Sequence, residues 1–307
     1  NQIPDFSYAG YQGGNKEIPD ALVKVVVPVK AGDATKRIQA AIDYVSKLPF
    51  GKDGLRGAVL LQEGEYQVLG SLKLHTSGVV LRGSGFNHSK TTILGDGVSR
   101  ETLIKVVGIN DVKLSDLKKV AANYVPVNAK SIPLENTVNL KVGDRVMITR
   151  PSTQEWINVL GTNHFGGGIT SLGWKPNQRN VYWDRTIVAI RGNAIEIDVP
   201  ITTALDQKYG SAIVEKYTWS GRIENVELKS AYNTANLKDE DHRWMAITIE
   251  NAENVWVRRI QFKHFAGSGV YALETAKKVT VEDCISLDPV SEIGGQRRYT
   301  FYTKGQQ

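Results

Sequence analysis

The chain has 307 residues, of which 41% are hydrophobic and 23% charged, and its formal net charge is +6. This balance is ordinary for a folded protein, excludes a disordered chain, and favours one elongated domain with a large core. No segment is apolar enough to span a membrane, and no dense Lys/Arg run or zinc-finger cysteine pattern favours a nucleic-acid partner. The positive charge indicates either a generally basic surface or long-range attraction of a polyanion.

Residues 1–56 predict an irregular lead-in, a strand and one helix. The β-branched run 23–29 predicts the strand, and Asp33 is a good N-cap residue for the helix. The apolar residues of the helix recur at i, i+3, i+4 and i+7: Ile38, Ala41, Ile42 and Val45. Pro49 and Gly51 end this helix of roughly 12 residues. Its apolar stripe must cover something, so we expect it to cap the first coil of a repeated fold.

The next segments predict coils and then a departure from them. Short apolar runs at 58–61, 72–74, 79–83, 92–94 and 103–106 predict strands of the first coils, 57–108, with a turn at 63–66. Residues 109–221 predict a β-rich excursion with strands at 125–127, 138–140 and 145–148. A hairpin follows at 186–197, across Gly192-Asn193. Its long loop carries Trp156, Trp174 and Trp183, which either stack on sugar rings or pack the excursion.

A repeat occupies residues 222–307. Asn254-Val255-Trp256-Val257 recurs 24 residues later as Lys278-Val279-Thr280-Val281, and a looser copy begins at Asn225. The same spacing pairs Ile247 and Ile249 with Tyr271 and Leu273. Short β-runs repeating every ~20–30 residues predict a solenoid. Cys284 then takes the inward place that Ile260 has in the preceding coil, so it is a core residue or, alternatively, a reactive thiol.

Three segments of the first half resemble a known family. They are 32–43 (GDATKRIQAAID), 61–66 (LQEGEY) and 78–85 (GVVLRGSG), which are similar to the start of pectate-lyase-type right-handed β-helix proteins, largely bacterial and phage carbohydrate-active proteins. The resemblance implies an all-β fold: a right-handed parallel β-helix (pectin-lyase-like) with an N-terminal capping helix and a β-rich excursion. This fold hosts lyases, hydrolases and non-catalytic proteins. Since the chain starts without Met, we expect a secreted or periplasmic bacterial protein.

Equivalent positions in the repeat gather polar residues on one edge. His264 lies nine residues after Val255, and Asp288 nine after Val279. In register they are neighbours about 4.8 Å apart along the coil axis, where the carboxylate would orient the imidazole and raise its pKa. Three successive coils therefore open into polar turns on the same edge: 239–243, 263–267 and 288–299.

These turns carry a second resemblance. Asp239-Glu240-Asp241-His242-Arg243-Trp244, His264-Phe265-Ala266-Gly267 and the segment from Asp288 to Phe301 resemble a group of bacterial pectate-lyase-like proteins of mostly undefined activity. Such proteins continue with further coils. We therefore expect the β-helix to continue beyond Gln307, with the remaining part of its own β-helix as a partner.

The turns predict a polysaccharide lyase acting by β-elimination on a uronate-containing acidic polysaccharide. His264, oriented by Asp288, or alternatively Lys263 is the candidate base, and Tyr299 the candidate acid. Arg297 and Arg298 are candidates to bind the substrate carboxylate. The other candidate substrate contacts are His242, Arg243, Glu292 and Trp174.

The sequence leaves alternatives open for the metal and for the reaction class. In related β-helix lyases Ca²⁺ often neutralises the carboxylate, and Asp239, Glu240 and Asp241 are oxygen ligands of that kind, although their spacing is no calcium motif. A glycoside hydrolase would need two carboxylates about 5–9.5 Å apart, such as Asp288 with Glu292 or with Asp241. A non-catalytic carbohydrate-binding β-helix is the third interpretation.

Overall fold

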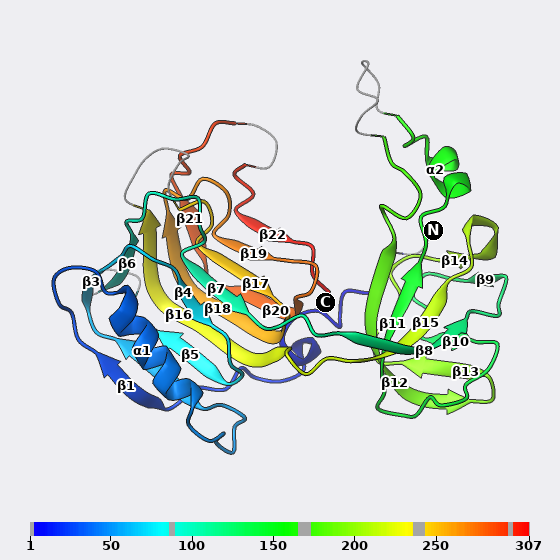
Figure 1. Cartoon of the computed structure of the whole chain (residues 1–307), viewed down its shortest axis with the longest axis horizontal. Helices are drawn as coiled ribbons and strands as arrows, with labels where there is room; N and C mark the ends of the chain where they lie inside the picture. The colour runs from blue at the N-terminus through cyan, green and yellow to red at the C-terminus, as the bar shows by residue number, and fades with distance from the viewer. Residues whose placement is uncertain (1–2, 86–89, 165–172, 236–242, 294–296, 307) are drawn as a thin grey trace. The chain divides into compact units, whose positions relative to one another are not determined.

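The computed structural model describes residues 3–85, 90–164, 173–235, 243–293 and 297–306, with 229–235 as backbone alone (Figure 1). The chain forms two compact units, which we describe separately. The excursion unit comprises Asn1–Phe6 and Asp111–Ser220, and the coil unit comprises Ser7–Asn110 and Gly221–Gln307. Both consist mainly of strands, so the predicted all-β class is confirmed. None of the described helices is long and apolar enough to cross a membrane.

The coil unit contains three stacks of parallel strands, all of them open sheets. The first stack is β1 (Val23–Val27), β2 (Gly57–Leu61), β5 (Val79–Arg82), β16 (Ile223–Ala235), β18 (Ala252–Lys263) and β20 (Lys277–Glu282). The second is β3 (Gly64–Val68), β6 (Thr91–Gly95), β16, β18 and β21 (Ile285–Leu287). The third is β4 (Leu72–Leu74), β7 (Ile104–Val107), β17 (Ile247–Glu250), β19 (Val270–Ala272) and β22 (Phe301–Thr303).

From β2 onward, each turn of the coil unit contributes to all three stacks, whereas β1 belongs to the first stack alone (Figure 1). β16 and β18 are long enough to belong to both the first and the second stack. The right-handed sense of the coil stays a prediction.

The register of the repeat agrees with the sequence at the first stack and departs from it at the third. Val226, Val255 and Val279 are paired neighbours, as predicted. Ile247, however, pairs with Val270 and not with the predicted Tyr271. The connection from Ala272 to Val279 is one residue longer than that from Ile249 to Val255, so equal spacing gave the wrong partner. Val270 and Ala272 are buried, whereas the neighbouring residues of the strand point the other way.

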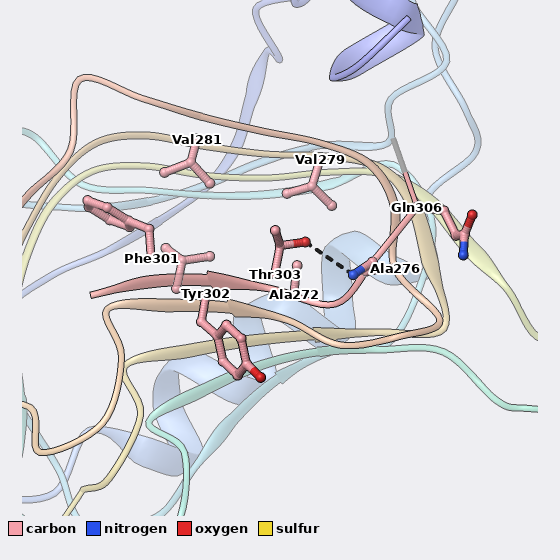
Figure 2. Close-up of a pocket in the computed structure, with 10 residues that line it drawn as sticks. Ala272, Ala276, Val279, Val281, Phe301, Tyr302, Thr303 and Gln306 are labelled. Carbon is pink, nitrogen blue, oxygen red and sulfur yellow. Dashed lines mark hydrogen bonds between the residues drawn. The ribbon is translucent and has the colours of Figure 1, made fainter. Parts of the chain in front are cut away.

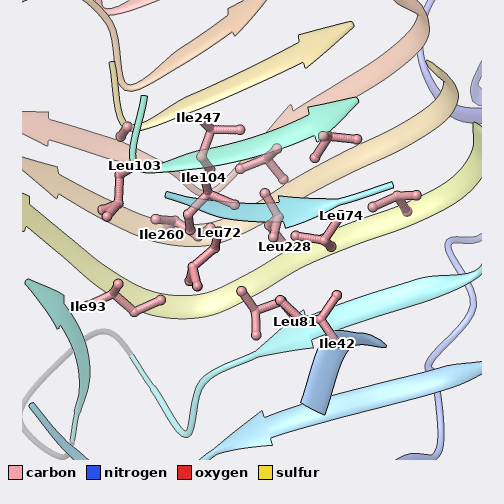
Figure 3. Close-up of a cluster of buried hydrophobic side chains, with 14 of the residues drawn as sticks. Ile42, Leu72, Leu74, Leu81, Ile93, Leu103, Ile104, Leu228, Ile247 and Ile260 are labelled. Atoms are coloured by element: carbon pink, nitrogen blue, oxygen red, sulfur yellow. The ribbon is translucent and has the colours of Figure 1, made fainter. Parts of the chain in front are cut away.

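The apolar side chains of all three stacks meet in one core. Leu72, Leu81, Ile104 and Ile260 come from different strands and point into the same interior (Figure 3). Helix α1 (Thr35–Ser46) adds its stripe to this core, and the four predicted apolar positions are all buried. The helix thus covers the interior next to the first coil, since β1, β2, β4 and β5 all contact it.

Two local predictions for the first coils were wrong. The N-cap is Ala34 and not Asp33, because the first helical hydrogen bond runs from Ile38 N to Ala34 O. The Asp33 carboxylate lies just outside the helix and accepts hydrogen bonds from Thr35 N (3.0 Å) and Leu69 N (3.2 Å). Residues 64–66 of the predicted turn 63–66 begin strand β3. Tyr66 is buried there, and its hydroxyl donates to Val27 O at 2.7 Å.

The excursion unit is built on an antiparallel sheet. Its strands lie in the order β10 (Ser131–Pro133), β13 (Ala194–Ile197), β12 (Val181–Arg191), β11 (Arg145–Arg150), β15 (Ile213–Thr218) and β8 (Lys113–Lys119). A second pair joins β9 (Tyr124–Val125) and β14 (Leu205–Asp206), and helix α2 (Gln154–Leu160) follows β11. The predicted hairpin is confirmed as β12–β13. The predicted strand at 138–140 is wrong, because Asn139 has φ +66° and Leu140 N donates to Thr137 O within a turn.

The structure decides between the two roles expected for Trp183, stacking on a sugar ring or packing the excursion. Its side chain is buried in the core of the excursion unit, and its Nε1 donates to Thr202 Oγ1 at 3.0 Å. Trp183 therefore packs the unit and offers no face to a sugar.

Candidate functional site

The turns that lead into the third stack lie on top of one another. We call them the turn ladder, which comprises residues 96–103, 243–246, 264–269 and 297–300. Backbone bonds join successive turns: Leu103 N to Met245 O (3.0 Å), Gly267 N to Trp244 O (2.8 Å) and Gly269 N to Thr300 O (2.9 Å). The strands that follow are in register, so each turn is held beside the next and its side chains meet those of its neighbours.

Lys263, His264 and Asp288 lie where the chain leaves the second stack, and of the three only His264 belongs to the turn ladder. The register pairs Lys263 with Leu287, so His264 and Asp288 occupy equivalent positions, as counted from the sequence. His264 N donates to Leu287 O at 3.3 Å, and both His264 and Asp288 have positive φ where the chain leaves the strand. The Asp288 carboxylate forms an ion pair with Lys263 Nζ at 3.3 Å, with the two side chains 66% and 32% exposed. The predicted contact between Asp288 and the His264 imidazole stays a prediction.

Arg298 fixes the last turn of the ladder. Its Nε donates to Ser291 O at 2.9 Å, and Nη2 donates to the same oxygen. Ser291 is buried, and its hydroxyl donates to Ala266 O at 2.7 Å, the carbonyl that also accepts from Arg298 N. These bonds hold Ser291 and Arg298 against the turn before them. Arg298, predicted to bind a substrate carboxylate, therefore positions the turn.

Arg243 is buried and therefore does not make its predicted contact with substrate. Its Nη2 donates to the carbonyls of Leu69 and Gly70, the latter at 2.9 Å, and its Nη1 donates to Ser99 Oγ at 3.2 Å. Glu101 completes the set at 3.5 Å. A buried guanidinium needs such acceptors around it, and here they tie the second turn to the first coils.

Trp244 is the aromatic centre of the ladder, and the sequence analysis did not select it. The guanidinium carbon of Arg100 lies 5.0 Å from the centre of its ring, and that of Arg297 lies 5.7 Å away. A Cβ atom on Gly267 would approach Trp244 Nε1 to 2.7 Å, so only glycine lets the indole pack over the third turn. Two cations from different turns thus share one half-buried indole. Trp244 is the last residue of the segment 239–244, and the resemblance of that segment was the available signal for it. Nothing in the sequence links Arg100 to Trp244.

Tyr299 and Glu292 lie on the segment after Asp288. The Tyr299 ring is 46% exposed and its centre lies 5.2 Å from that of Tyr302, which in turn stacks on Tyr271 at 4.7 Å. Glu292 is exposed. Both side chains are therefore at the surface, where a substrate would meet them.

The predicted Ca²⁺ ligands Asp239, Glu240 and Asp241, and also His242, lie outside the described residues. In the described part of the chain, no three His, Cys, Asp or Glu side chains gather as metal ligands would. The metal site and the role of His242 stay predictions.

Trp174 belongs to the excursion unit, unlike the residues above. Its ring centre lies 5.8 Å from that of Trp156, at an interplanar angle of 37°. The backbone N of Trp174 donates to Thr162 O at 2.8 Å. Trp174 is thus held in a structured part of its unit, beside a second indole.

A cavity of about 250 Å³ lies beside the last strand of the third stack (Figure 2). Its walls are mainly apolar and include Val270, Val279 and Phe301, while Gly305 N donates to Thr303 Oγ1 at 3.1 Å within it. Among the predicted site residues that the structure describes, none lines this cavity. It is a continuation of the apolar interior and brings no reactive groups together.

No family model matches the chain, and no curated protein matches it. Solved structures that are similar to it include the tailspike protein gp49 from Pseudomonas phage LKA1, at 18% identity and a TM-score of 0.43 over 81% of this chain and 36% of the tailspike. Another is the Gp54 tailspike of Acinetobacter baumannii bacteriophage AP22 in complex with A. baumannii capsular saccharide, at 9% identity and a TM-score of 0.39 over 90% of this chain and 43% of that one.

A third similar structure is described as a glycoside hydrolase, at 9% identity and a TM-score of 0.36 over 85% of this chain and 65% of that one. The chain spans less than half the length of each of the two tailspikes. The neighbours are carbohydrate-active and tailspike proteins, and these similarities assign no activity to the chain itself.

Proposed function

We propose that the coil unit binds an acidic polysaccharide along the turn ladder and cleaves it at uronate residues by β-elimination. The observation that carries the proposal is the indole of Trp244 with the guanidinium groups of Arg100 and Arg297 beside it. An indole offers a flat apolar face to a sugar ring, and a guanidinium pairs with a carboxylate through two parallel N–H donors. The net charge of +6 supports attraction of an anionic polymer.

β-Elimination requires three groups, and the ladder offers candidates for each. Arg297 would neutralise the C6 carboxylate, which acidifies the proton on C5. A base removes that proton, its electron pair forms the C4=C5 double bond, and the C4–O4 bond breaks. Tyr299, half exposed, would donate a proton to the departing O4.

We assign the base to His264 and not to Lys263. The Lys263 ammonium is paired with Asp288, and an ammonium in an ion pair has no free electron pair to accept a proton. Asp288, at the position equivalent to His264, would then balance the charge of the protonated imidazole. Ca²⁺, where bound by Asp239, Glu240 and Asp241, would add positive charge at the substrate carboxylate.

The test combines binding and product analysis on polygalacturonate and alginate, with dextran as the neutral control. We expect ultraviolet absorbance from the unsaturated uronate product, lost in His264→Ala. We expect binding about tenfold weaker in Trp244→Ala and in Arg297→Gln, since each contact contributes about 1–2 kcal/mol. Arg259→Gln is the matched control, because Arg259 is an exposed arginine of the same unit that faces Asp283 at 3.8 Å.

Other outcomes would redirect the assignment. New reducing ends without unsaturated product would indicate a hydrolase, with Asp288 and Glu292 as the carboxylates to test. Binding without any product would indicate a carbohydrate-binding protein. Equal binding by Trp244→Ala and the unmodified chain would refute the ladder as the site.

A further inference from the structure

The excursion unit contains a row of four cationic and aromatic side chains that the proposed function does not use. The guanidinium carbon of Arg150 lies 4.3 Å from the ring centre of Trp156, and the ring of Trp156 lies 5.8 Å from that of Trp174. The guanidinium carbon of Arg179 lies 5.7 Å from the ring of Trp174. Two cations therefore flank a pair of indoles, and we call these four residues the tryptophan pair site.

Arg150 is the unusual member of this row. The residue is 5% exposed, and two of its guanidinium nitrogens, Nε and Nη1, are buried with no hydrogen-bond acceptor among the described residues. A buried cation with unsatisfied donors is costly unless an anion compensates it. Burial lowers the pKa of the Arg150 guanidinium, and the attraction of Asp206 offsets this only in part. The excursion unit thus keeps a positive charge next to Trp156 that Asp206 offsets only in part.

The backbone around the row is firmly held. Ser152 is buried, its N donates to Asn180 Oδ1 at 2.8 Å, and its hydroxyl accepts from Arg179 N at 3.0 Å. Thr153 caps α2 by accepting from Trp156 N at 3.3 Å. These bonds fix the segments that carry Trp156 and Arg179 before any ligand arrives, which lowers the entropic cost of binding.

We propose that the tryptophan pair site binds a carboxylated saccharide, separately from the turn ladder. The indole faces of Trp156 and Trp174, both half-buried, would contact the apolar face of sugar rings. Arg179 is exposed and would pair with a sugar carboxylate, while the charge of Arg150 adds attraction for the same anion. A saccharide fits better than an acidic peptide, because two adjacent flat rings lie between the two cations and match the apolar face and the carboxylate of a uronate.

The experiment measures binding to the full chain by calorimetry, in the background of Trp244→Ala with Arg297→Gln so that the turn ladder is silent. The probes are a trigalacturonate, a trimannuronate, maltotriose as the neutral control and tetraglutamate as the acidic peptide. We expect one of the two uronate trimers to bind at least tenfold more tightly than maltotriose and tetraglutamate. Trp174→Ala and Arg179→Gln should each raise its Kd about tenfold. Arg191→Gln, which removes an exposed arginine paired with Glu196 at 2.9 Å in the same unit, should leave the Kd unchanged.

Three results would overturn the proposal: no preference for a uronate trimer over maltotriose, equal or tighter binding of tetraglutamate, or the same Kd in Trp174→Ala as in its parent. Circular dichroism of each variant confirms that the fold is kept. The proposal does not rest on the proposed function. If the proposed function is wrong, the unmodified chain will not cleave the polysaccharide. If the tryptophan pair site is wrong, only the trimer titrations will show it.

Discussion

Replacing Arg243 by alanine should destabilise the coil unit strongly. The guanidinium donates to two carbonyls, Leu69 O and Gly70 O, to a hydroxyl on Ser99, and to the carboxylate of Glu101. Hydrogen bonds of a charged group contribute about 1.5–3 kcal/mol each. The bond to Glu101 counts for little, because that carboxylate is 56% exposed and screened by water. Removing one member of a buried charged network costs about 3–5 kcal/mol, since the remaining polar groups lose their partners.

Calorimetric unfolding of the full chain measures this effect. For a unit of this size, about 4 kcal/mol corresponds to a Tm lower by roughly 10 °C. Arg259→Ala is the matched control: its exposed side chain, 60% accessible, faces Asp283 at 3.8 Å, and we expect a loss of at most about 0.5 kcal/mol. Arg243→Lys should fall between the two, because a single ammonium cannot reach the same set of acceptors. Equal Tm values for Arg243→Ala and Arg259→Ala would refute the reasoning.

Three further predictions concern single side chains. Burial raises the pKa of the Cys284 thiol to about 11, so alkylation of Cys284 should be slow at neutral pH and become fast only as the pH approaches 11. A pH series with iodoacetamide measures this rate, and a rate profile with its midpoint near pH 8.5 would contradict the prediction. Gly267→Ala should displace the Trp244 indole, whose Nε1 would lie 2.7 Å from the new Cβ, and weaken uronate binding about tenfold in calorimetry; unchanged affinity would contradict the assigned packing. Partial burial acts to raise the pKa of Asp33, but hydrogen bonds from Thr35 and Leu69 outweigh it and hold that pKa below its ordinary value. The stability that this carboxylate contributes is therefore present above the unfolded-state pKa and lost as pH falls through the folded one; urea unfolding should show Asp33→Asn as less stable at neutral pH and equal in acid.

The register of the first stack followed from the sequence because its strands carry the same apolar pattern after the same spacing. Val255 and Val279 are paired, and Cys284 packs against the core as its predicted inward position requires. Equal spacing failed at Tyr271, since one turn is a residue longer than its neighbour. Turn lengths vary without changing the strand pattern, so a sequence repeat shows them poorly.

The site was harder to predict because its members meet across turns. Trp244 and Arg100 are joined only once the coils stack, and no local spacing connects them. Arginine is usually a surface residue. The burial of Arg243 depends on oxygen atoms supplied by segments far earlier in the chain. The sequence also does not show that Arg298 donates to Ser291 O through Nε and Nη2, whereas its predicted contact with a substrate carboxylate stays a prediction. Charged residues in turns therefore need the stacked neighbours before their roles can be assigned.

The long strands β16 and β18 constrain how this protein can change over generations. Each passes through two stacks without a break. One inserted residue within either strand would move every later side chain of that strand to the opposite face of the sheet, and both stacks depend on the register of that strand. Insertions in the turns between stacks shift no register. Natural selection is thus free to change the turns while the strands stay fixed, so the proposed binding surface can vary without rebuilding the scaffold.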